Sequence, residues 1–159
     1  MNTKKWQELN WDFPDPYVIN VTVKDSDTDG YNHVNNAVYL GWMDRCVWEH
    51  CDAVNMGPQQ CLLLDRGFAA VKHEIYYLGS AYAGEEVLIG NWVTRNDGRL
   101  RSERQFQIVR RSDNQTLVRA KTDYVCTKLS SGQPARVPVE FKEAFSVSPD
   151  IQRIIDSKS

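Results

Sequence analysis

The sequence predicts an α+β protein in which an antiparallel sheet of about five strands wraps around one long central helix. Residues 36–50 carry apolar side chains on most sides of a helix, which is typical of a buried helix. Residues 68–128 instead follow a period of two, with turn signals at 96–98 and 112–114. Strands joined by consecutive hairpins pair in antiparallel fashion. Taken alone, this periodicity allows any α+β sheet that carries one helix on a face.

The first elements are an arm and a strand. Residues 1–16 contain Trp6, Trp11 and Phe13 together with prolines, which disfavour a helix. We expect this arm to lie over the body of the protein, because exposed aromatic clusters are uncommon on monomers. A strand is expected over residues 17–24, where every second residue is apolar, so that one face of the strand is apolar.

The main helix is expected over residues 36–50, after Asn35 and Asn36, which are both good capping residues. A shorter helical piece is expected over 59–65, closed by Gly67. Four strands then follow over 68–78, 85–95, 100–111 and 116–128. The tail is rich in glycine and proline, so we expect a loop with one or two short helical pieces there.

The composition is that of an ordinary globular protein. The chain has 159 residues, of which 42% are hydrophobic and 25% are charged, which suits one domain. The formal net charge of −2 argues against nucleic acid as the main partner. No apolar run approaches the roughly 20 residues of a membrane span, and the first residues do not have the apolar stretch of a secretory signal. We therefore expect a cytoplasmic protein that does not insert into membranes.

The four cysteines raise the question of a metal site. Cys46 and His50 are spaced so that both could bind a metal from one face of the main helix. The sequence has no CxxC motif and no second pair of ligands. Small apolar thiols in a reducing compartment explain the same residues, so we expect no metal.

Polar groups concentrate between the first strand and the main helix. Three carboxylates, Asp25, Asp27 and Asp29, are followed by His33 and by the helix start at Asn36. The first N–H groups of a helix are unpaired and carry partial positive charge. Such an end can hold a developing oxyanion while a nearby carboxylate attacks a carbonyl or activates water. The sequence therefore points to a reactive site at this helix start, with Asp27 shaping the turn.

One ordered motif runs through this stretch: Asp27-Thr-Asp29, then His33-Val-Asn-Asn36, then Ala37-Val-Tyr39-Leu and Asp44. It resembles the motif of the hotdog-fold acyl-CoA thioesterases of the 4-hydroxybenzoyl-CoA and long-chain acyl-CoA types, and plant acyl-ACP thioesterases carry a related segment. The resemblance extends from about residue 17 to 138. We expect one hotdog domain over 1–159, formed by this core, the arm 1–16 and an extension over 139–159. Because hotdog domains pair their sheets, the resemblance also implies a homodimer or homotetramer with the site between two subunits.

The resemblance implies roles for three residues. Asp29 corresponds to the acid that acts as nucleophile or general base, although aspartate is also common in plain turns. His33 matches an active-site histidine of the plant relatives. Three roles are open for it: to tune Asp29, to bind the thioester oxygen, or only to anchor the turn. Asn36 would polarise the thioester carbonyl through its backbone N–H, while its side chain could equally be a cap. Tyr31 replaces an asparagine of the plant relatives, and Asp44 is expected to be structural, with catalysis as the alternative.

A basic stretch provides a second signal. Residues 95–123 hold eight basic and four acidic side chains, and arginine binds phosphate well. In the resembling family the nucleotide part of coenzyme A lies against this region of the sheet, so Arg99, Arg101 and Arg104 are the candidates for contacts with it. A solvated sheet face balanced by acids elsewhere explains the same charges.

The leading hypothesis is an acyl-CoA thioesterase that needs no metal or organic cofactor. Hotdog hydratases place an Asn-Pro pair between their aspartate and histidine, and no proline lies between Asp29 and His33, which argues against a hydratase. A non-catalytic protein that binds acyl-CoA or an acyl carrier is the other alternative. Val38, Trp42 and Met43 are expected to line the acyl pocket. The acyl group of the substrate could be aryl, medium-chain or long-chain, and the form of the motif favours fatty acyl chains. An acyl carrier protein could deliver the substrate in place of coenzyme A.

Overall fold

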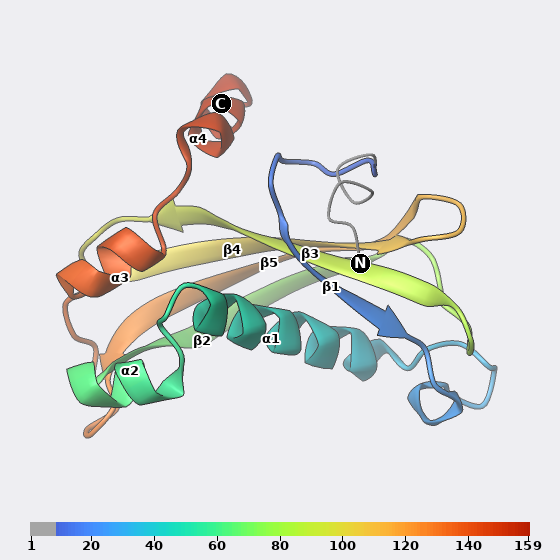
Figure 1. Cartoon of the computed structure of the whole chain (residues 1–159), viewed down its shortest axis with the longest axis horizontal. Helices are drawn as coiled ribbons and strands as arrows, with labels where there is room; N and C mark the ends of the chain where they lie inside the picture. The colour runs from blue at the N-terminus through green and yellow to red at the C-terminus, as the bar shows by residue number, and fades with distance from the viewer. Residues whose placement is uncertain (1–8) are drawn as a thin grey trace. The chain divides into compact units, whose positions relative to one another are not determined.

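The computed structural model describes residues 9–159 (Figure 1), and Trp6 of the expected arm lies outside them. The elements in chain order are β1 (Tyr17–Thr22), the 3-10 turn η2 (Asp25–Asp27), α1 (Asn36–Ala53), α2 (Pro58–Leu64), β2 (Arg66–Tyr77), β3 (Glu86–Asn96), β4 (Arg101–Arg110), β5 (Gln115–Lys128), α3 (Val139–Ala144) and α4 (Pro149–Ser157). Every helix and strand expected from the sequence is present, with ends that differ by a few residues. The tail contains two short helices.

The five strands form one sheet in the order β1-β3-β4-β5-β2. β1 pairs antiparallel with β3, so that Tyr17 lies opposite Asn91 and Thr22 opposite Glu86. The strands β3, β4 and β5 follow one another both in the chain and in the sheet. The predicted α+β class, with a five-stranded antiparallel sheet and one long helix, is therefore confirmed. Because β2 is last in the order, it is an edge strand.

The described chain divides into two compact units. The first contains residues 9–47, 75–92 and 106–120, and the second contains residues 48–74, 93–105 and 121–159. Each unit has its own interior. The expected division into a core, an arm and an extension stays a prediction.

The core of the first unit joins α1 to the sheet. The helix contributes Tyr39, Trp42, Met43 and Cys46, which are spaced as one helix face and are all buried. They pack with side chains from four strands, among them Ile19, Val21, Val87, Ile89, Ile108 and Leu117. The predicted burial of the helix is confirmed for this face. Trp48 is 46% exposed, so the helix is not buried on every side.

Cys46 links α1 to two strands within this core. Its thiol donates to the carbonyl oxygens of Ile89 at 3.4 Å and Tyr17 at 3.6 Å, and it accepts the Asn91 Nδ2 group at 3.1 Å. The side chain is completely buried. Among residues 9–159, no three metal-binding side chains come together.

The described part of the arm packs on the first unit, as expected. The rings of Trp11 and Phe13 meet the Trp92 ring edge-on, with centroids 6.0 and 5.3 Å apart. Trp92 Nε1 donates to the Pro14 carbonyl at 2.9 Å. A Cβ atom at Gly90 would lie 2.9 Å from the Trp11 ring, so the close approach of the arm requires glycine at this position.

An aromatic cluster forms the interior of the second unit. The Phe68 ring of β2 lies 5.3 Å from the Phe141 ring and 6.1 Å from the Phe145 ring. Asn96 Nδ2 donates to the Phe145 carbonyl at 3.1 Å and so ties the end of β3 to the end of α3. No helix of residues 9–159 has the length and apolar character needed to cross a membrane.

The end of α2 corrects one expectation, because Asp65 and not Gly67 closes this helix. Asp65 has a left-handed φ of 52°, and its N–H donates to the Cys61 and Leu62 carbonyls. Aspartate tolerates this conformation better than most residues do. The Ser130 hydroxyl donates to the carboxylate at 2.7 Å, and this bond is the main cause that lowers the pKa of Asp65. Gly67 instead lies inside β2.

Candidate active site

A closed turn connects β1 to α1. The Asp27 carboxylate accepts the Lys24 N–H at 2.9 Å, and the Asp27 carbonyl accepts the Asn35 N–H at 2.9 Å. Thr28 and Val34 pair as an isolated antiparallel bridge. Asp27 therefore shapes the turn as expected, and the loop that contains the candidate acid and histidine is held at both ends.

Asp29 and His33 are joined across this loop. The Asp29 N–H donates to the His33 carbonyl at 2.7 Å. The Asp29 Oδ1 atom accepts the N–H groups of Tyr31 at 2.8 Å and His33 at 3.3 Å. Within residues 9–159 the Oδ2 atom has no hydrogen-bond partner, and the residue is exposed. The loop thus fixes the carboxylate through one oxygen and leaves the other available.

The start of α1 carries a backbone N–H group that is available to a ligand. Asn35 is the cap, because its Oδ1 accepts the Ala37 N–H at 3.0 Å and its carbonyl accepts the Val38 N–H at 2.9 Å. Asn36 is the first residue of the helix, and its carbonyl accepts the Tyr77 hydroxyl at 3.1 Å. In the part of the chain that the structure describes, the Asn36 N–H has no acceptor, and Asn36 is exposed. This N–H can therefore take an oxygen atom from a ligand.

His33 lies against the loop that connects β2 to β3. It forms a bridge with Tyr82, and the two rings meet edge-on with centroids 5.0 Å apart. The next residue, Val34, donates its N–H to the Ala81 carbonyl at 3.0 Å, and the Ala81 N–H donates to the Tyr39 hydroxyl at 2.9 Å. Burial, the largest cause, raises the pKa of Tyr39. The neutral Tyr39 hydroxyl thus holds the loop on which His33 rests.

Comparison with known proteins identifies the family. Residues 23–145 match the thioesterase-like superfamily. The chain belongs to this superfamily. No match is found among the curated proteins.

Solved structures, two thioesterases among them, share the fold of this superfamily member. The 1,4-dihydroxy-2-naphthoyl-CoA thioesterase Slr0204 from Synechocystis superposes with a TM-score of 0.74 and 21% identity, over 82% of this chain and 96% of that chain. The dynemicin thioesterase gives 0.72 and 24%, over 83% and 96%. The protein SAV2348 from Staphylococcus aureus, solved in complex with CoA, gives 0.75 and 13%, over 85% and 84%. At these identities the likeness concerns the fold alone, and it confirms the predicted hotdog fold.

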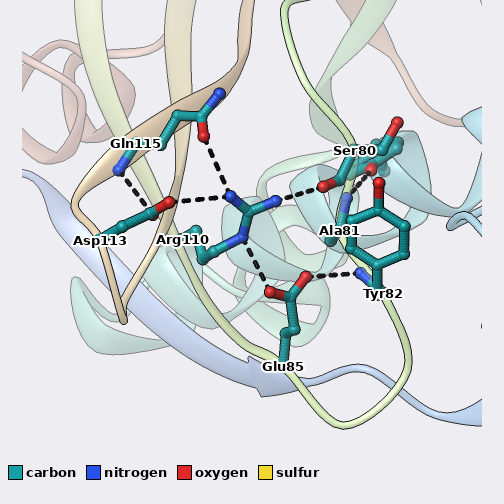
Figure 2. Close-up of polar contacts among 8 residues, drawn as sticks. Ser80, Ala81, Tyr82, Glu85, Arg110, Asp113 and Gln115 are labelled. Atoms are coloured by element: carbon teal, nitrogen blue, oxygen red, sulfur yellow. Dashed lines mark hydrogen bonds and ion pairs between the residues drawn. The ribbon is translucent and has the colours of Figure 1, made fainter.

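In this thioesterase-like chain, Arg110 of β4 organises the loop that carries Tyr82 (Figure 2). Its Nε pairs with Glu85 Oε2 at 2.9 Å, its Nη1 pairs with Asp113 Oδ2 at 3.0 Å, and its Nη2 donates to the Ser80 carbonyl. Glu85 Oε1 in turn accepts the Tyr82 N–H at 2.7 Å. Burial acts to lower the pKa of Arg110, but the Asp113 and Glu85 carboxylates outweigh it and raise that pKa. No local pattern predicts this network, because its two halves, residues 80–85 and 110–113, lie far apart along the chain.

The three arginines expected to contact coenzyme A lie in the second unit, in two different environments. Arg99 and Arg101 are exposed. Arg104 is only 6% exposed. Its Nη1 lies 2.8 Å from His50 Nδ1, and its guanidinium carbon lies 5.3 Å from the centre of the Phe145 ring. Arg104 therefore belongs to the interior of the unit, unlike the other two arginines.

The residues expected to line an acyl pocket pack in the interior of the first unit. Trp42 and Met43 are buried in its core, and Val38 packs against that core while partly exposed.

Asp44 is exposed on α1. Asp25 lies in η2, where its carbonyl accepts the Thr28 hydroxyl at 2.6 Å.

Proposed function

We propose that the protein is an acyl-CoA thioesterase, which hydrolyses the thioester of an acyl-CoA to a free acid and coenzyme A. The observation that carries the proposal is that the loop between η2 and α1 holds one available group at Asp29 and ends at a second one, the first N–H of α1. The Oδ2 atom of Asp29 is not used by the loop, and within residues 9–159 the Asn36 N–H at the helix start has no acceptor. Membership of the thioesterase-like superfamily supports the same chemistry.

Two routes use these groups, and the proposal includes both. In the first, Asp29 Oδ2 attacks the thioester carbonyl carbon, the C–S bond breaks, and the thiolate of coenzyme A leaves. Water then hydrolyses the mixed anhydride and restores the carboxylate. In the second, Asp29 takes a proton from water as the water attacks the carbonyl carbon. In both routes the Asn36 N–H stabilises the negative charge that develops on the carbonyl oxygen.

His33 is proposed to support this chemistry from beside the acid. Its N–H holds Asp29 Oδ1, and its ring rests on Tyr82. The loop geometry alone suits an anchor of the turn, and the alternative role is that the ring binds the thioester oxygen. A His33→Ala variant separates these roles, since loss of an anchor lowers the thermal midpoint, whereas loss of an oxygen donor lowers kcat in a protein that stays folded.

The proposed partners follow from the exposed charges and from the sheet edge. Arg99 and Arg101 are proposed to contact the phosphates of coenzyme A, because arginine binds phosphate through paired donors. Arg104 is enclosed by His50 and Phe145, so we assign it a structural role instead. The exposed edge strand supports a homodimer, or a homotetramer built from dimers. The proposed site of action is the cytoplasm.

A thiol-release assay tests the proposal. Purified protein is given a panel of acyl-CoAs of different chain length, benzoyl-type CoAs and acyl carrier protein thioesters, and Asp29→Asn is measured beside it. Asp27→Asn is the matched control, since Asp27 lies in the same turn and its amide oxygen can still accept the Lys24 N–H. We expect Asp29→Asn to lose about 10²- to 10⁴-fold in kcat and the control to keep its activity.

Three outcomes of this assay separate the alternatives. Mass spectrometry of an acid-quenched reaction detects an acyl adduct on Asp29 if it is the nucleophile and none if it is a general base. Full activity in Asp29→Asn would move the chemistry to another residue. Binding of acyl-CoA without turnover of any substrate would favour a non-catalytic acyl-binding protein.

A further inference from the structure

The loop between β2 and β3 supports the turn that carries Asp29, and both lie in the first unit. The Val34 N–H donates to the Ala81 carbonyl at 3.0 Å, and the neighbouring His33 forms an antiparallel bridge with Tyr82. Inside the turn, the His33 carbonyl accepts the Asp29 N–H at 2.7 Å. The backbone at His33 therefore lies between the acid and the loop, so a shift of the loop would shift Asp29.

The guanidinium of Arg110 fixes this loop from within the unit (Figure 2). The Arg110 side chain is only 12% exposed, and its Nη2 donates to the Ser80 carbonyl. Its Nε pairs with Glu85 Oε2 at 2.9 Å, and Glu85 Oε1 accepts the Tyr82 N–H at 2.7 Å. Arg110 thus holds the loop directly at Ser80 and, through Glu85, at Tyr82, on either side of the contact between Ala81 and the turn.

The contacts of Arg110 depend on the shape of its side chain as well as on its charge. The third nitrogen, Nη1, pairs with Asp113 Oδ2 and donates to Gln115 Oε1, both at 3.0 Å. A guanidinium presents its donors in a rigid planar fork, whereas the lysine ammonium is a point charge on a flexible stem. A lysine at position 110 would therefore keep the charge and lose the simultaneous contacts in three directions.

We propose that Arg110 is a positioning residue for the reaction, and that it holds Asp29 in place through the loop between β2 and β3. This inference rests on the proposed thioesterase activity and extends it to a residue far from the turn in sequence. Asp29 Oδ2 and the Asn36 N–H have to meet the same thioester carbonyl group. A misplacement of about 1 Å can cost about 10²-fold in rate, so a loop that loses its support lowers kcat.

A conservative substitution separates the shape of Arg110 from its charge. We expect Arg110→Lys to lower kcat about 10- to 100-fold and to leave KM nearly unchanged, because the substrate still binds while the acid is misplaced. Thiol release is measured well below the thermal midpoint of the variant, so that the protein is folded. Arg111→Lys is the matched control, since Arg111 follows in the chain and its Nη1 pairs with Glu86 at 3.0 Å, outside the loop. It should keep the native kcat.

Two truncations separate support of the loop from general stability. Glu85→Ala and Asp113→Ala each remove one ion pair of Arg110 and one acceptor of a backbone N–H, since Glu85 accepts the Tyr82 N–H and Asp113 accepts the Gln115 N–H at 3.1 Å. Both variants should lower the thermal midpoint measured by circular dichroism. Only Glu85→Ala should also lower kcat by about tenfold or more, because Glu85 contacts the loop and Asp113 does not adjoin it in the chain.

Hydrogen exchange reads the position of the loop without any substrate. The Val34 N–H is protected by its bond to the Ala81 carbonyl, and exchange speeds up when a segment opens locally. We expect faster exchange at Val34 in Arg110→Lys and Glu85→Ala than in Asp113→Ala. Arg110→Lys combined with Glu85→Ala should lower kcat little more than the stronger single change, because both act through one network.

The outcomes separate this inference from the proposed function. A native chain that releases thiol from no acyl-CoA refutes the thioesterase proposal and, with it, the role of Arg110. An active native chain in which folded Arg110→Lys keeps its kcat refutes the inference alone. An equal loss of kcat in Glu85→Ala and Asp113→Ala also refutes it, and this comparison decides the test if Arg110→Lys does not fold.

Discussion

The backbone N–H of Asn36, at the start of α1, allows a specific test of the proposed chemistry. Asn36→Pro removes the N–H that we propose as the oxyanion donor and removes little else. Proline is tolerated at the first position of a helix, where its fixed φ suits the helix and its missing N–H breaks no internal bond. Here the Asn36 N–H has no acceptor within residues 9–159, and the cap is made by Asn35 to Ala37. We therefore expect the fold to survive this substitution.

The expected size of the effect follows from that geometry. Loss of one oxyanion donor typically costs about 10²- to 10³-fold in kcat. Because the bond to the oxyanion is strongest in the transition state, the loss should appear in kcat and leave KM nearly unchanged. Thiol release under saturating acyl-CoA measures kcat, and thermal unfolding by circular dichroism checks the fold.

Asn36→Ala is the control for the side chain. It keeps the backbone N–H and removes only the amide group, so its kcat should stay near the native value. The reasoning is refuted if Asn36→Pro keeps its kcat while folded, or if Asn36→Ala loses as much as Asn36→Pro does.

Three further predictions concern other parts of the structure. Arg110→Gln should lower the free energy of unfolding by about 2 kcal/mol, measured in urea, because it removes ion pairs with Glu85 and Asp113; an unchanged midpoint would contradict the role given to this network. Burial acts to raise the pKa of Asp97, but three backbone N–H bonds outweigh it and lower that pKa. The resulting stability is present above the ordinary value near 4 and is lost as pH falls through the lower folded pKa, so the native chain should lose more stability than Asp97→Asn on acidification from pH 6 to pH 3. Arg99→Glu combined with Arg101→Glu should raise KM for acyl-CoA several-fold with little change in kcat, and an unaltered KM would place coenzyme A elsewhere.

Much of the fold was predictable because its signals are local. The period of two between residues 68 and 128 predicted the strands, and the two asparagines predicted where α1 begins. The structure distinguishes those asparagines, since Asn35 makes the cap and the Asn36 N–H has no acceptor in the described part of the chain. Such a division depends on the path of the turn, which the residue types alone do not define.

What could not be predicted depends on contacts between distant residues. Arg104 has the same residue type as its exposed neighbour Arg101, yet it is enclosed by His50 and Phe145. The position of β2 at the edge of the sheet follows from strand order, which alternation does not encode. Asp65 was missed as the end of α2 because a left-handed aspartate is rarer than a left-handed glycine.

The burial of Cys46 makes this residue a reporter of unfolding. Its thiol is completely enclosed and is hydrogen-bonded to β1 and β3, and alkylating reagents react with accessible thiolates. A reagent can therefore modify Cys46 only in molecules whose first unit has opened. The rate of labelling at this one position would then report the opening equilibrium of the unit in native buffer, without any denaturant.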